Sequence, residues 1–84
     1  MKIDLLKYKR NLPAVENYLK ANPQMSFDDK MTNLSVVTYV PLIVVAHYIM
    51  KIEGKSKEFD AAIVRLMAFY KYDEVVGIEE LMEL

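Results

Sequence analysis

His47 is the only histidine of this chain, and it lies inside the longest apolar run, residues 36–50. An imidazole can act as a general base or as a pH switch near neutral pH, but a base also needs a group that orients it and a nucleophile or substrate. No nearby residue in the sequence supplies either. The sequence therefore favours a histidine at the edge of the core that is hydrogen-bonded to backbone or solvent.

Two pairs of adjacent acids, Asp28-Asp29 and Glu79-Glu80, are the other candidates for catalysis. Neighbouring side chains on a helix point about 100° apart, so neither pair forms a catalytic dyad by itself. Helix capping and a solvated face explain both pairs. The chain also lacks cysteine, a glycine-rich phosphate loop, a His-Glu metal signature and a nucleophile motif. We therefore expect a protein that is not an enzyme, with no catalytic residue, no cofactor and no metal site.

A basic cluster near the start of the chain suggests a different chemistry. Lys7, Lys9 and Arg10 surround Tyr8, which could stack on a base. Four cations within 2–10 make a small footprint, and the formal net charge of the chain is −1, so binding to nucleic acid would be weak and salt-sensitive. A weak nucleic-acid binder is therefore kept as a second alternative.

The C-terminal segment 73–84 carries the most suggestive pattern, because it holds five acidic residues and no basic one. As a helix it would be amphipathic, but Gly77, its short length and its acidic last turn make it marginal alone. Such a segment gains order by docking, either on its own bundle or in a groove of another protein or a second copy. The predicted partner-binding residues are Ile78, Glu79, Glu80, Leu81, Met82 and Glu83.

Few helix breakers occur, and they fall where helix boundaries are expected. Pro13 suits a first helical turn, Ser26 and Ser56 are good N-caps, and Gly54 is a C-terminal stop. The pattern predicts an all-α fold, a small compact bundle of about five short helices. Helices are expected over 3–11, 13–22, 27–40, 42–53 and about 57–72, followed by a last short one that Asp73 caps. One face of the helix over 27–40 carries Phe27, Met31, Leu34 and Val37. One face of the helix over about 57–72 carries Phe59, Ile63, Leu66 and Tyr70.

The segment 42–53 is apolar almost all round, so it is either the central helix of the bundle or a membrane helix. Extended to 34–52 it reaches the length that spans a bilayer, although Pro41 and Lys51 interrupt it. A small membrane-associated protein is therefore the first alternative. The β-branched residues within 36–45 leave open an α+β fold with short strands there, but no hairpin turn accompanies them.

Residues 1–84 are too few for more than one domain, and the predicted domain is helical throughout. The absence of cysteine and of a continuous apolar signal sequence predicts a cytoplasmic protein. The expected function is non-enzymatic: a small stoichiometric regulator, inhibitor or adaptor that associates through its helices with another protein or with a second copy of itself.

Overall fold

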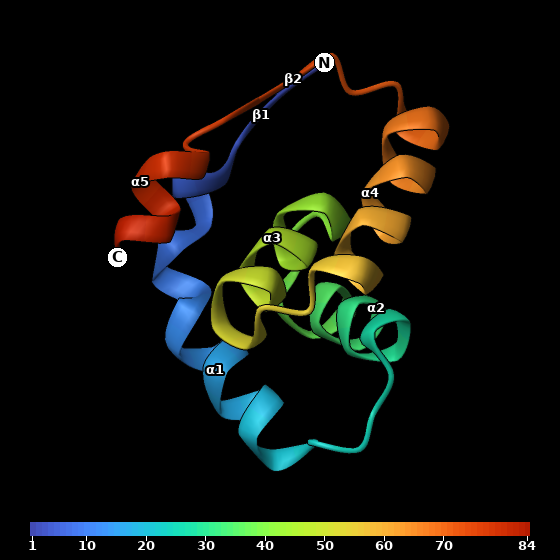
Figure 1. Cartoon of the computed structure of the whole chain (residues 1–84). Helices are drawn as coiled ribbons and strands as arrows, with labels where there is room; N and C mark the ends of the chain where they lie inside the picture. Colours follow the sequence, from blue (N-terminus) through green and yellow to red (C-terminus); the bar gives the residue numbers. More distant parts are fainter.

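The computed structural model describes all 84 residues and consists of helices packed around one central helix (Figure 1). Strands are limited to one short parallel pair, so the predicted all-α class is confirmed. The elements in chain order are β1 (Lys2–Asp4), the 3₁₀ helix η1 (Leu5–Asn11), α1 (Leu12–Ala21), α2 (Phe27–Thr38), α3 (Leu42–Glu53), α4 (Ser56–Tyr70), β2 (Glu74–Val76) and α5 (Ile78–Glu83).

The central helix is α3, which contacts α1, α2 and α4. Every residue from 43 to 49 is buried. Pro41 precedes the helix, and Gly54 ends it with a φ of 70°, so both predicted boundaries are confirmed. The hydroxyl of Tyr48 donates a hydrogen bond to the carbonyl oxygen of Leu5 at 2.5 Å, which ties α3 to η1, and burial raises the pKa of Tyr48 to about 12.

The alternative of strands within 36–45 is wrong. Helix α2 continues through Thr38, Tyr39 adopts a left-handed conformation with a φ of 60°, and α3 begins directly after Pro41. The β-branched residues of α3 are buried by helix packing, which overrides their strand propensity. Pro41 divides 34–52 between two helices, and no helix of the chain is long and apolar enough to cross a membrane.

The two strands join opposite ends of the chain, an arrangement that the sequence did not predict. β1 pairs in parallel with β2, and Ile3 lies opposite Val75. The helix expected over 3–11 therefore begins only after Asp4, whose carboxylate accepts the Leu6 N–H at 3.0 Å. Asp73 does not cap the last helix as predicted. It precedes β2 and forms an ion pair with the amino group of Met1 at 2.9 Å.

Helix α2 begins as predicted, because the Ser26 side chain accepts the Asp29 N–H at 3.2 Å. Its buried face begins with Phe27, Met31 and Leu34, as expected, but Val37 is 68% exposed. The next inward position is instead Thr38, whose hydroxyl donates to the Leu34 carbonyl oxygen. At 3.6 residues per turn the eleven steps from Phe27 to Thr38 complete three turns, so Val37 falls to one side.

Helix α4 begins one residue earlier than predicted. Ser56 is the first helical residue, and its side chain makes no capping hydrogen bond. The expected inner face is correct at its centre, where Leu66 is buried and Phe59 and Ile63 are half-buried, but Tyr70 is 43% exposed.

Candidate functional site

Helix α5 is anchored on the chain's own bundle, where it packs against η1. Its anchor is Leu81, which is 1% exposed and belongs to the main core. Gly77 precedes the helix with a φ of 91°, and a Cβ at this position would lie only 3.2 Å from the Leu6 side chain. A positive φ and a close neighbour therefore both favour glycine at the start of α5.

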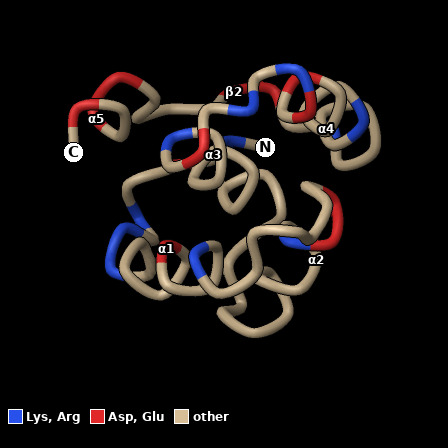
Figure 2. The backbone as a smooth tube through the Cα atoms, turned by 60° about the horizontal axis from the view of Figure 1, so that its bottom comes forward, with Lys and Arg blue, Asp and Glu red and all other residues tan.

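The rest of α5 faces outward. Ile78 and Met82 are 46% and 50% exposed, and Glu79, Glu80 and Glu83 are exposed as well. None of these three carboxylates forms an ion pair. Figure 2 shows acidic positions and no basic ones along this helix. The structure thus leaves five of the six predicted partner-binding residues on the surface, whereas Leu81 lies in the core.

Four residues form two rows on this surface, and the two members of each row are four positions apart in the sequence. Ile78 and Met82 therefore lie one above the other, and Glu79 and Glu83 form a parallel row beside them. An apolar strip next to a carboxylate strip is a surface that can bind an apolar group flanked by cations.

Helix η1, which carries the basic cluster, packs against α5, but the cluster forms no ion pair with it. Lys7, Lys9 and Arg10 are exposed, and none of them forms an ion pair with a glutamate of α5. The proposed nucleic-acid footprint within 2–10 therefore remains a prediction, carried by three exposed cations on η1 and by Lys2 on β1.

His47 occupies the position that the sequence favoured. It is 8% exposed, its Nδ1 lies 2.7 Å from the Ile43 carbonyl oxygen, and its ring meets Phe59 edge-on with centroids 4.9 Å apart. Because a carbonyl oxygen only accepts, Nδ1 carries the proton. Burial lowers the pKa of His47, and the hydrogen bond with Ile43 offsets part of this effect.

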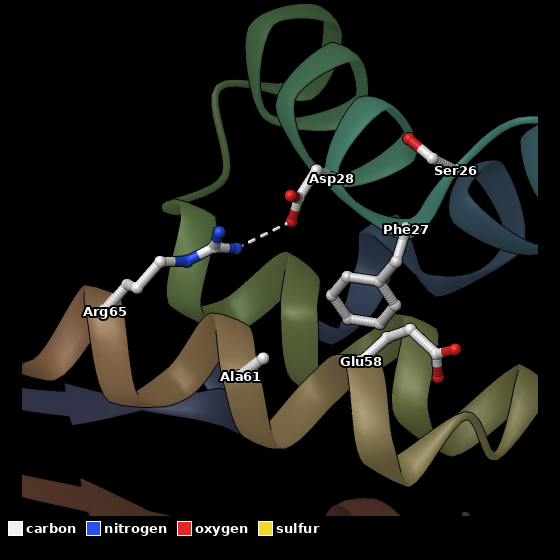
Figure 3. A pocket seen from close by; sticks show the side chains of 6 residues that line it. All are labelled: Ser26, Phe27, Asp28, Glu58, Ala61 and Arg65. Atoms are coloured by element: carbon white, nitrogen blue, oxygen red, sulfur yellow. Dashed lines mark hydrogen bonds and ion pairs between the residues drawn. The ribbon is translucent and has the colours of Figure 1, made fainter.

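A hollow of about 210 Å³ lies between the start of α2 and α4 (Figure 3). Three of its polar side chains are engaged: the Ser26 side chain accepts the Asp29 N–H and so caps α2, and Arg65 pairs with Asp28 at 2.8 Å, whereas Glu58 forms no ion pair. The ion pair of Arg65 with Asp28 links α4 to α2. No group of three histidine or acidic side chains in the chain is arranged to hold a metal ion. The lining residues are Ser26, Phe27, Asp28, Glu58, Ala61 and Arg65.

The structure exposes further apolar groups that sequence reasoning missed. On α4, Val64 and Phe69 are 70% and 77% exposed, and the Phe69 ring meets Tyr70 edge-on at 4.9 Å. Tyr70 in turn stacks on Tyr72 just before β2. Residues 64 and 69 lie outside the expected inner stripe of α4, and this is the signal that could have identified them. Val36 and Val37 on α2, and Tyr39 directly after it, are exposed as well.

Comparison of the chain with protein-family models, with curated proteins and with solved structures found no match. Its function must therefore be inferred from its own surface.

Proposed function

We propose that this chain is a non-enzymatic protein-interaction module that binds its partner through the outward side of α5. The observation that supports this proposal most strongly is the combination of three unpaired carboxylates with the half-exposed Ile78 and Met82 on a helix that Leu81 anchors to the core. A solvated helix face needs no apolar row, and a core helix needs no unpaired acids. Both together fit a docking surface.

The apolar row and the acidic row would contribute to binding in different ways. Glu79 and Glu83 attract a basic partner from a distance and so raise the rate of encounter. Ile78 and Met82 supply affinity once they leave water, and the flexible Met82 side chain adapts to an irregular groove. The partner we expect therefore carries an apolar groove bordered by Lys or Arg. A stoichiometric regulator, inhibitor or adaptor would act through this contact.

The test begins with capture of partners from the native cell on immobilised full-length chain, followed by kinetic binding measurements on each purified partner. We expect the Glu79→Lys/Glu83→Lys variant to lower the association rate about tenfold or more at low salt, with a much smaller loss at high salt. Met82→Ser should instead raise the dissociation rate.

Asp60→Lys is the control for a charge reversal outside α5, because Asp60 is an exposed acid on α4 that forms no ion pair. It should leave both rates unchanged. A partner whose binding responds equally to Asp60→Lys and to the α5 variants, or responds to neither, would contradict the assignment of α5.

A further inference from the structure

The strand pair of β1 and β2 leaves one edge of each strand without a partner strand. Each strand has only three residues, and β1 has its one extensive contact with β2. A two-stranded sheet is marginal in water, and an open edge is a template for pairing with another chain. The free edges of β1 and β2 can therefore accept a further strand.

The sequence of β1 is self-complementary for antiparallel pairing. It reads Lys2-Ile3-Asp4, with Ile3 buried and both charged residues exposed on the opposite face. If two copies pair with Ile3 opposite Ile3, Lys2 of each copy lies directly opposite Asp4 of the other. Opposite charges in this position stabilise a sheet.

The two charged groups keep the capacity for these pairs, although Lys2 also lies opposite Glu74 of β2. Lys2 has no ion pair in the single chain, and Asp4 uses only Oδ1, for the Leu6 N–H. The other possible antiparallel pairings are poorer. Pairing β1 with β2 in matched register sets Asp4 opposite Glu74, and pairing β2 with itself sets Glu74 opposite Val76. Only β1 with β1 gives two opposite-charge pairs.

We propose that two copies of this chain associate through antiparallel pairing of their β1 edges about a two-fold axis at Ile3, which gives a four-stranded sheet in the order β2, β1, β1, β2. This inference rests on the proposed function, since it names a second copy as one partner, but its strand pairing uses the β1 edge and not the outward rows of α5. Such an isologous contact closes on itself as a dimer.

The ends of the strand pair support this arrangement. The end at which β1 begins lies beside Asp73, close to the segment that leads from the end of α4 into β2, and the other end leads into α5 (Figure 1). Antiparallel pairing brings the α4 end of one copy to the α5 end of the other. Exposed apolar groups are present at both ends.

The test is sedimentation equilibrium of the full chain over a wide concentration range. We expect a monomer–dimer equilibrium in the unmodified chain. Lys2→Glu sets two carboxylates opposite each other at both pairs and should weaken the dimer about tenfold or more. Lys57→Glu is the control, because Lys57 is an exposed residue of α4 without an ion pair, and the same charge change there should have no effect.

A mixing experiment makes the register testable. Asp4→Lys chains should not pair with themselves, but mixed with Lys2→Glu chains they restore two opposite-charge pairs, so a mixed dimer should form. Because Asp4 caps η1, circular dichroism must first show that the variant keeps its helices; Asp4→Asn, which keeps an acceptor, should weaken the dimer without that risk.

A chain that stays monomeric at every concentration would overturn the strand pairing and leave the α5 proposal intact. A dimer that weakens with Glu83→Lys but not with Lys2→Glu would also overturn it, and would place self-association on α5 instead.

Discussion

Lys30 and Glu53 bring opposite charges together inside the bundle, where α2 crosses the end of α3. Nζ of Lys30 lies 3.1 and 3.0 Å from the two carboxylate oxygens of Glu53, and the lysine side chain is 1% exposed while the glutamate is 18% exposed. Only Glu53 has a second cation nearby, Lys55 at 3.9 Å. The burial of the two partners is therefore unequal.

Removal of either partner should reflect this inequality. Glu53→Ala leaves a buried ammonium without a counter-ion and should lower the free energy of unfolding by about 3 kcal/mol or more. Lys30→Met leaves a carboxylate that can reach water and Lys55, so the loss should be clearly smaller. Urea unfolding of both variants measures the difference. Equal losses would contradict the unequal burial.

The buried His47 should make the fold sensitive to acid. Its pKa is lowered in the folded chain. Below the ordinary value of 6.5, His47 therefore becomes protonated in the unfolded chain while it stays neutral in the folded chain. The free energy of unfolding should therefore fall as the pH decreases from about 6.5 towards the lower pKa of the folded state.

Urea unfolding between about pH 7.5 and about pH 5.5 measures this effect. His47→Asn keeps an N–H donor for the Ile43 carbonyl oxygen but has no titrating group, so its stability should vary less over the same interval. An identical pH dependence of the two proteins would exclude His47 as the cause.

At the scale of elements, the sequence predicted a helix boundary correctly where a residue at that boundary sets it through its own backbone. Pro41 and Gly54 act on their own backbone, so the bounds of α3 follow from the sequence. Pairing of β1 with β2 depends on residues at opposite ends of the chain, and neither segment carries a local signal for it. For that reason the sequence predicted a helix where β1 stands and a cap at Asp73.

Helix α5 shows the same division within the candidate site. Its amphipathic pattern separates apolar from acidic residues, and this much the sequence predicted. The pattern cannot say which apolar residue meets the chain's own core, because Ile78, Leu81 and Met82 all lie on the apolar side of the predicted helix. Only the packing of α5 on η1 assigns Leu81 to the core and leaves the other two outside.

At the scale of the whole molecule, β2 and α5 close the fold around the start of the chain. Removal of 74–84 takes away the partner of β1 and the buried Leu81. Loss of one buried leucine side chain alone costs about 2–5 kcal/mol, and a small domain has only about 5–15 kcal/mol in total. The truncated chain should therefore melt at least about 10 °C lower, since each kcal/mol shifts the midpoint of a domain of this size by about 4–8 °C.

Met82→Ser provides the comparison, because it changes α5 only where the helix faces solvent and should leave the melting midpoint nearly unchanged. Thermal circular dichroism of the three proteins measures both effects. If the truncated chain has the same melting midpoint as the unmodified one, β2 and α5 contribute no stability. Leu81 would then be as available to a partner as Ile78 and Met82. A large loss on truncation, with none for Met82→Ser, would instead mean that one helix serves the core with its inner side and remains free to bind with its outer side.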